Sequence, residues 1–109
     1  MELNKKLLDN IINVTSTAAV ACYPYLGKKD KLLVDKAATD EMRKQLNDLD
    51  INGMVVIGEG ELDKAPMLYI GEKLGTGEGP SIDIAVDPLE GTNFAANNLP
   101  GALSVIAVA

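Results

Sequence analysis

The sequence contains no histidine and only a single cysteine among its 109 residues. Without histidine, the chain cannot catalyse a reaction through an imidazole or bind zinc through imidazole nitrogens. Cys22 has no second cysteine with which to form a disulfide inside the chain, and lone cysteines are typical of proteins in reducing compartments. We therefore expect a cytoplasmic protein in which Cys22, flanked by Ala21 and Tyr23, belongs to the core and is not a nucleophile.

Long apolar runs are also absent, so we expect no association with a membrane. No stretch approaches the ~20 apolar residues that span a bilayer. Near the start, two polar residues separate Leu7-Leu8 from Ile11-Ile12, so the hydrophobic region of a signal peptide is missing. With 109 residues, of which 47% are hydrophobic, the chain is long enough for one small globular domain at most.

Positive charge is scarce. Ten lysines and arginines stand against 16 aspartates and glutamates, which gives a net charge of −6. This balance disfavours nucleic acid as a partner, and a small anionic substrate would be repelled unless metal ions intervene. Lys28, Lys29 and Lys31 form a short basic run that we interpret as a solvated surface, with a phosphate contact by Lys31 as the alternative.

Two helices are expected first. Apolar or small residues three and four apart predict an amphipathic helix that ends before Pro24; they are Leu3, Leu7, Leu8, Ile11, Ile12, Thr15, Ala18, Ala19 and Cys22. The same spacing predicts a second helix from Val34 to Leu46. Asp35 falls near its first turn, where a carboxylate favours the helix macrodipole, so a helix cap is the simplest role for this residue.

Alternating residues from Ile82 to Asp87 predict a strand, and Pro88 is expected to end it. Asp87 would then project beyond the strand, with Glu90 three residues later on a tight turn. Two hard oxygen donors so placed suit Mg²⁺ or Mn²⁺. The alternative is a strand followed by a Pro-Gly turn whose acids are merely solvated.

A second acidic segment follows another strand. The apolar run Met54 to Ile57 predicts a central strand buried on both faces. Glu59, Glu61 and Asp63 follow it closely, and three neighbouring carboxylates repel one another unless a cation lies between them. Glu59 is the preferred metal ligand because it comes first after the strand, and Glu61 and Asp63 are weaker candidates. The alternative is an acidic, flexible loop.

Glycine is concentrated between residues 71 and 79, where it resembles a phosphate cradle. The run lacks the G-K-[ST] ending of a P-loop and leads into a strand, so we interpret it as a connecting loop. A short helix beginning at Thr92 would place the free amides of Gly91 and Thr92 at a helix N-terminus, which is a ready anion site. Leu103 to Ala109 then predicts one more buried strand, and because the sequence stops inside it we expect a fragment of a longer protein.

Two long motifs, I-G-E-G-E-x-D-x-A-P-M-L-Y-I-G-E-K-x-G-T-G and D-I-A-V-D-P-x-E-G-T, are similar in order and spacing to the class II fructose-1,6-bisphosphatase family. This family belongs to the metal-dependent, lithium-sensitive sugar and inositol phosphatase superfamily. The similarity runs from about Gly27 to the last residue. It implies an α+β fold with layered helices over a largely antiparallel sheet, with residues 1–109 as the N-terminal, metal-binding part of a sugar bisphosphatase that is a homo-oligomer.

The resemblance also implies roles for individual residues. Asp35, Glu59, Asp87 and Glu90 occupy the family's metal-carboxylate positions for Mg²⁺ or Mn²⁺, and the Leu89 carbonyl is a further possible ligand. Thr92 together with Asp35 would polarise the attacking water. Glu90, Gly91 and Thr92 lie where the family holds the scissile phosphate. Two cations ~3.5–4 Å apart can clamp both the attacking and the leaving oxygen, so neither histidine nor an arginine cluster is required.

The resemblance implies hydrolysis of the 1-phosphate of fructose 1,6-bisphosphate, giving fructose 6-phosphate and phosphate, in gluconeogenesis or a related route. Two alternatives stay open. One is a related phosphatase for sedoheptulose bisphosphate or an inositol phosphate, and the other is a non-catalytic fragment that acts as an assembly module. Because substrate contacts and a further metal-binding glutamate would lie beyond residue 109, we expect the isolated chain to be inactive.

Overall fold

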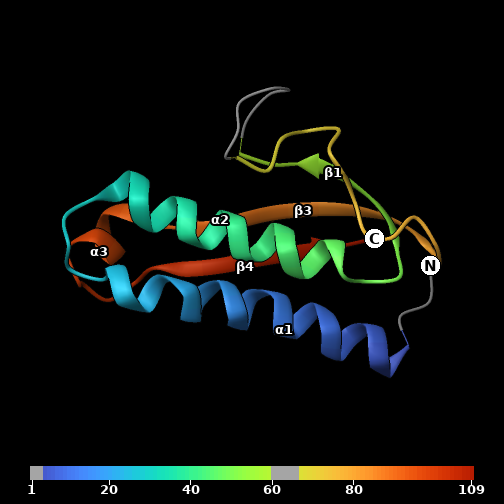
Figure 1. Ribbon diagram of the computed structural model, residues 1–109, viewed down its shortest axis with the longest axis horizontal. Helices are drawn as coiled ribbons and strands as arrows, with labels where there is room; N and C mark the ends of the chain where they lie inside the picture. The colour runs from blue at the N-terminus through green and yellow to red at the C-terminus, as the bar shows by residue number, and fades with distance from the viewer. Residues whose placement is uncertain (1–3, 60–66) are drawn as a thin grey trace.

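The computed structural model describes residues 4–59 and 67–109. Two long helices lie side by side over one face of a sheet of four strands, and a short helix lies at one end of both (Figure 1). The elements in chain order are α1 (Lys5–Cys22), the 3-10 helix η1 (Tyr23–Tyr25), α2 (Lys31–Asn47), β1 (Asn52–Ile57), β2 (Lys73–Leu74), β3 (Ser81–Glu90), α3 (Thr92–Ala96) and β4 (Leu103–Val108).

The sheet has the strand order β2-β1-β3-β4. β1 and β3 are parallel at the centre, whereas β2 pairs with β1 and β4 pairs with β3 in antiparallel fashion. The predicted α+β architecture, with helices layered over a largely antiparallel sheet, is therefore confirmed, and its parallel central pair makes the sheet mixed. β2 lies within the glycine-rich run that we had interpreted wholly as a loop.

The first helix begins where a side chain caps it. Asn4 accepts a hydrogen bond from the Leu7 amide at 2.8 Å, which satisfies one free donor of the first turn. The buried stripe is Leu7, Ile11, Val14, Ala18 and Cys22. Leu8 and Ile12 were predicted to join this stripe, but they are exposed because residue positions 8 and 12 fall one step outside the spacing that faces the sheet.

The second helix also begins at a capping residue, but this residue is Asp30 rather than Asp35. The Asp30 carboxylate accepts a hydrogen bond from the Leu33 amide at 3.1 Å. Asp35 lies one turn further along α2 and is therefore not needed to satisfy the free amides at the N-terminus. The interpretation of Asp35 as a helix cap was wrong, and this residue is left for another role.

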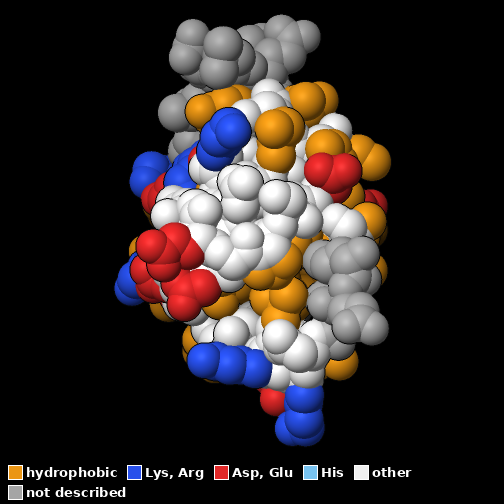
Figure 2. All heavy atoms as spheres, turned by 90° about the vertical axis from the view of Figure 1, so that its right-hand side faces the viewer, with side chains coloured by type: hydrophobic (Ala, Val, Ile, Leu, Met, Phe, Trp, Pro, Cys, Tyr) orange, Lys and Arg blue, Asp and Glu red, His pale blue; other side chains and the backbone are white. Residues whose placement is uncertain are grey.

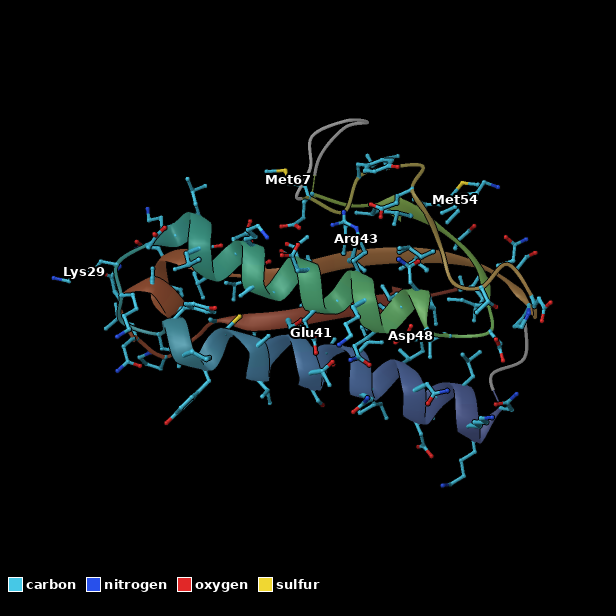
Figure 3. All side chains as sticks on the ribbon, in the orientation of Figure 1. Lys29, Glu41, Arg43, Asp48, Met54 and Met67 are labelled. Atoms are coloured by element: carbon cyan, nitrogen blue, oxygen red, sulfur yellow. The ribbon has the colours of Figure 1, made fainter. Side chains whose placement is uncertain are left out.

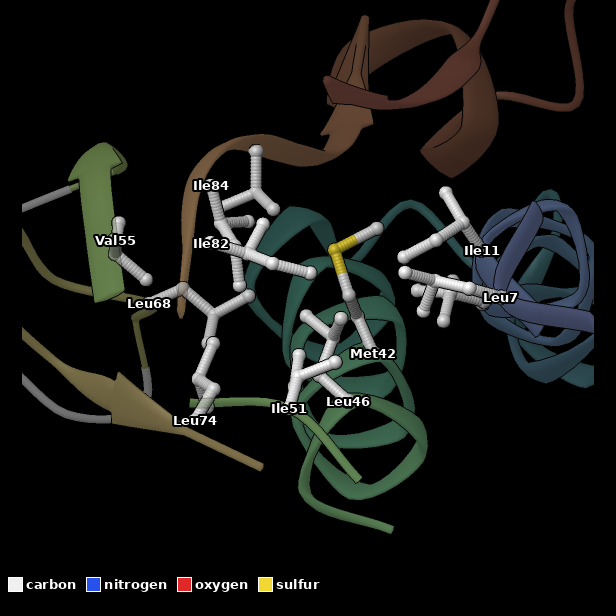
Figure 4. Packing of buried hydrophobic residues seen from close by; sticks show 13 residues of the cluster. Leu7, Ile11, Met42, Leu46, Ile51, Val55, Leu68, Leu74, Ile82 and Ile84 are labelled. Atoms are coloured by element: carbon white, nitrogen blue, oxygen red, sulfur yellow. The ribbon is translucent and has the colours of Figure 1, made fainter. Parts of the chain in front are cut away.

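The core fills the space between the helices and the sheet. Met42 of α2 lies at its centre, with Leu7 and Ile11 of α1 on one side and Ile82 and Ile84 of β3 on the other (Figure 4). A second cluster surrounds Cys22 and includes Val34, Ala38, Leu89, Ala95 and Ala96. Burial raises the pKa of the Cys22 thiol, and its Sγ donates to the Ala18 carbonyl. Cys22 is thus a core residue, as expected.

The opposite face of the sheet is open among the described residues. β1 is central in the sheet, but Val56 is 42% exposed and Met54 and Ile57 are exposed as well, so this strand is buried on one face only. β4 was predicted to be buried, but it is an edge strand with Leu103 60% exposed and Val105 44% exposed. Both predictions failed for one reason: an apolar run does not reveal whether each face of its strand has a partner layer.

The end of the molecule away from α3 carries acidic and basic side chains around apolar and uncharged surface (Figure 2). Charges of both signs are therefore mixed on this side and do not form a basic patch. No helix among the described residues is long and apolar enough to cross a membrane.

Candidate metal and phosphate site

Strand register brings Glu59 and Asp87 to the same edge of the sheet. β1 and β3 run parallel, and Ile57 of β1 is paired with Ala85 of β3. Glu59 and Asp87 each lie two residues beyond that pair. The carboxyl ends of neighbouring parallel strands meet at one sheet edge, which is where α/β proteins commonly bind ligands. Two acidic segments that are 28 positions apart in the sequence therefore converge.

Pro88 does not end β3, contrary to the prediction, because the strand continues to Glu90. The pairing with β4 shifts between Asp87, which faces Val105, and Glu90, which faces Leu103. Three steps along β3 match two steps along β4, so the strand bulges at the proline. A bulge leaves one residue outside the ladder, and proline, which has no amide hydrogen to donate, fits there. The bulge leaves Asp87 half-buried and Glu90 exposed.

Asp35 on α2 faces the same region. The carboxylate is partly buried, and its Oδ1 atom is buried without a hydrogen-bond partner among the described residues. Burial raises the pKa of Asp35, and the nearby charge of Asp87 raises it further. A buried oxygen that lacks a donor carries a desolvation penalty of ~1–3 kcal/mol. Asp35 is thus a carboxylate held beside another carboxylate with one oxygen unsatisfied.

Glu59 is the third member of this group. Burial, the charge of Asp35 and, to a smaller extent, that of Asp87 raise the pKa of Glu59 to about 7, although a hydrogen bond from Thr39 opposes the shift. The Thr39 hydroxyl donates to Oε1 of Glu59 at 3.2 Å. The Glu59 amide donates to the Leu68 carbonyl at 2.8 Å, which fixes the main chain just after β1. The charges of Asp35 and Asp87 therefore lie close enough to Glu59 to oppose the ionisation of its carboxyl group.

The turn after β3 carries Gly91 and Thr92. Gly91 has φ +80°, and a Cβ atom there would lie 2.9 Å from the Phe94 ring, so glycine is required on both counts. The Thr92 hydroxyl donates to the Leu89 carbonyl at 3.3 Å. α3 begins at Thr92 as predicted, but it has only five residues. In the described part of the chain no hydrogen bond joins Thr92 to Asp35, so their joint action on a water stays a prediction.

The donor set has the chemistry of a site for a hard divalent cation, namely carboxylate oxygens at a strand edge. Two observations favour a cation there: the unsatisfied Asp35 Oδ1, and the burial and neighbouring negative charges that raise the pKa of Asp35 and of Glu59. Within residues 4–59 and 67–109, however, no group of three or more histidine, cysteine, aspartate or glutamate side chains is arranged to enclose a metal ion. The metal site thus remains a prediction that the residues fit chemically.

Other sequence candidates are less informative. Glu61 and Asp63 lie outside the described residues. Lys31 is the exposed first residue of α2. The exposed Glu90 lies at the end of β3, one residue before Gly91.

Sequence reasoning missed a polar stripe on α2. Asp35, Thr39 and Arg43 are spaced by four residues, so they lie on one helix face beside the apolar stripe that faces the core. This spacing was visible in the sequence. It was overlooked because a threonine and an arginine in a helix are usually assigned to the solvent side.

Arg43 anchors residues 67–72, the next described segment after Glu59. Its Nε donates to Oε2 of Glu72 at 2.8 Å, and its Nη2 donates to Oε1 of Glu72 at 3.0 Å and to the Met67 carbonyl at 2.6 Å. Figure 3 shows Arg43 pointing from α2 toward Met67. Glu72 is only 7% exposed and also accepts from the Tyr69 amide. This two-bond pair holds residues 67–72 against α2, next to Glu59.

The chain matches the family described as bacterial fructose-1,6-bisphosphatase, glpX-encoded, over residues 5–109, and it belongs to that family. The family resemblance inferred from the two motifs is thereby confirmed.

Individual relatives carry names that agree with this family. The chain is 52% identical over 106 residues to fructose-1,6-bisphosphatase 1 class 2 of Escherichia coli K12, which covers 97% of this chain and 32% of that protein. It is 49% identical over 107 residues to D-fructose 1,6-bisphosphatase class 2/sedoheptulose 1,7-bisphosphatase of Prochlorococcus marinus MIT 9303, covering 96% and 31%. The chain thus spans about a third of the length of these relatives.

A solved structure shares the fold. The extragenic suppressor from Pyrococcus furiosus matches with a TM-score of 0.61 and 21% identity, covering 96% of this chain and 40% of that one. At this level of identity the likeness concerns the arrangement of helices and strands.

Proposed function

We propose that this chain is the metal-binding part of a phosphatase that removes the 1-phosphate of fructose 1,6-bisphosphate, yielding fructose 6-phosphate and phosphate. The observation that carries the proposal is the convergence of Asp35, Glu59 and Asp87 from a helix and two strand ends, with the pKa of Asp35 and of Glu59 raised by burial and by the neighbouring carboxylates. The names of the E. coli and Prochlorococcus relatives support the substrate class.

In this proposal Asp35, Glu59, Asp87 and Glu90 hold Mg²⁺ or Mn²⁺. When bound, the cations would neutralise the phosphate and lower the pKa of the attacking water. The chain itself positions these carboxylates. The bulge at Pro88 sets the spacing between Asp87 and Glu90, and the register of β1 and β3 brings Glu59 level with Asp87.

Thr92 would orient the attacking water, and the proton of that water would pass to the Asp35 carboxylate. The Thr92 hydroxyl donates its hydrogen to the Leu89 carbonyl, so the lone pairs of its oxygen remain able to accept a hydrogen bond from the water. Glu90, Gly91 and Thr92 form the turn on which the scissile phosphate would lie. Gly91 has a positive φ and no side chain, so a phosphate could approach the backbone of this turn closely.

A second substrate is favoured by the Prochlorococcus relative, whose name includes sedoheptulose 1,7-bisphosphatase. Both sugars present a phosphate ester on a terminal carbon, so the same set of carboxylate side chains would serve either substrate.

The test is phosphate release from fructose 1,6-bisphosphate, sedoheptulose 1,7-bisphosphate and an inositol phosphate, with Mg²⁺ or Mn²⁺ present. It requires a polypeptide that carries this chain together with the remaining two thirds found in its relatives. Asp87→Asn should remove several kcal/mol of transition-state stabilisation and so lower turnover roughly 10²-fold or more. Asp83→Asn, a change at an exposed aspartate on the same strand, is the matched control and should retain activity. Turnover of Asp87→Asn within about threefold of wild type would contradict the metal role.

A further inference from the structure

Thr39 makes an unusual contact for a helical threonine. It is 1% exposed, and its hydroxyl reaches away from its own helix to Oε1 of Glu59 at 3.2 Å. Threonine and serine within helices ordinarily donate to a carbonyl one turn earlier. Three residues of α1 do so here: Thr15 and Ser16 donate to Ile12, and Thr17 donates to Asn13 at 2.9 Å.

The contact helps to fix the Glu59 side chain. Glu59 lies two residues beyond the end of β1, and the bond from its own amide to the Leu68 carbonyl fixes the main chain but not the three side-chain torsions. The carboxylate itself is held by the Thr39 hydroxyl on Oε1 and by a backbone hydrogen bond at Leu68, and Thr39 is the side chain of this pair. Because Thr39 is buried, water cannot replace Glu59 as the acceptor of its hydroxyl. Breaking this hydrogen bond would leave a buried donor unsatisfied, so the bond is favoured.

The spacing of residues on α2 also links Thr39 to Asp35. Thr39 lies four residues after Asp35, so both side chains leave the same face of α2. The helix therefore presents a carboxylate directly to the site and, one turn later, the hydroxyl that orients a second carboxylate arriving from β1.

We propose that Thr39 is a positioning residue that orients the Glu59 carboxylate for a divalent cation. The inference rests on the proposed function, because it assumes that Glu59 is a ligand. Groups that hydrogen-bond to metal ligands commonly change metal affinity 10–100-fold when they are removed.

The experiment measures the dissociation constant of Mn²⁺ alone, without substrate, by calorimetric titration of the purified protein. Thr39→Val keeps the shape of the side chain but removes the donor, and it should weaken Mn²⁺ binding about tenfold. Thr39→Ser keeps the donor and should bind within about threefold of wild type. Thr17→Val is the matched control, since its hydroxyl donates only within α1, and it should bind Mn²⁺ as wild type does.

Circular dichroism and thermal melts establish that each variant is folded, and Thr39→Ala supplies a second donor-free variant should valine disturb packing. Equal affinity for wild type and a folded donor-free variant would overturn the role of Thr39 alone. Loss of affinity in the serine variant equal to that in the donor-free variant would also overturn it, because the hydroxyl would then be irrelevant. A wild-type protein that takes up no Mn²⁺ would overturn both this proposal and the metal site of the proposed function.

Discussion

Replacing Glu59 by glutamine should make the folded protein less sensitive to pH. Glutamine has nearly the same shape and can still accept the hydrogen bond from Thr39. It carries no charge, so it removes both the desolvation cost of the carboxylate and its repulsion with Asp35 and Asp87. The comparison isolates the ionisation of a single group.

The sign follows from the direction of the pKa change. The pKa of Glu59 is raised from its ordinary value of 4.5 to about 7, so the folded state binds this proton more tightly than the unfolded chain does. The corresponding stability is fully present below about pH 4.5 and is lost as pH rises through about 7. Asp35, whose pKa is also raised, contributes in the same direction.

The magnitude is measurable. A pKa difference of one unit corresponds to about 1.4 kcal/mol. Because Glu59 is only half-buried, solvent screens its interactions, so its contribution is reduced to about 1–2 kcal/mol of unfolding free energy. For a domain of roughly 100 residues, 1 kcal/mol moves the melting temperature by about 4–8 °C. Between pH 4.5 and 8, the melting temperature of wild type should therefore fall by about 4–16 °C relative to that of Glu59→Gln.

The assay is urea denaturation of wild type and Glu59→Gln across this pH range in buffer with a chelator. Glu78→Gln, at an exposed loop position, is the control and should follow wild type. Added Mn²⁺ should restore wild-type stability at pH 7.5 and have little effect on Glu59→Gln. The reasoning would be refuted if the free-energy difference between wild type and Glu59→Gln stayed constant within about 0.5 kcal/mol from pH 5 to 8.

Three further outcomes are expected. Thr92→Ala should lower kcat by 10²–10⁴-fold with little change in KM while Thr92→Ser keeps much of the rate, and equal rates for both variants would refute its role with the water. Arg43→Met should cost about 3 kcal/mol in urea denaturation because it leaves the buried Glu72 unpaired, and converting Glu72 to glutamine as well should recover part of the loss. The 109-residue chain alone should be inactive and self-associate through exposed β4, and Val105→Lys should reduce its light scattering.

Elements with a clear hydrophobic period were predictable from the sequence. The apolar spacing of Leu7, Ile11 and Ala18 and of Val34, Ala38 and Met42 located both long helices, because burial on one face requires that spacing. The strand from Ile82 was located by its alternation, which again reports one buried face.

The failures share a cause, because each depended on a neighbour that the local sequence does not reveal. Whether Pro88 ends a strand or lies in a bulge depends on how β4 pairs with β3. Whether Met54 and Val56 are covered depends on a layer over the open sheet face. The two motifs contain Glu59, Asp87 and Glu90, and the family resemblance proposed Asp35 as well. That Asp35 and Asp87 both approach Glu59 became visible only once α2 was placed on the sheet.

The polar stripe of α2 explains how one helix serves both stability and site geometry. Val34, Ala38, Met42 and Leu46 fix the helix on the sheet, and Asp35, Thr39 and Arg43 repeat with the same spacing of four, one position further along. A constant offset between two stripes means that the packing of the core sets where the polar groups arrive. Asp35 then lies near the charge of Asp87, Thr39 donates to Glu59, and Arg43 donates to Glu72. A change in the core that rotates α2 would disturb all three contacts together, whereas a change at one polar residue should disturb its own contact.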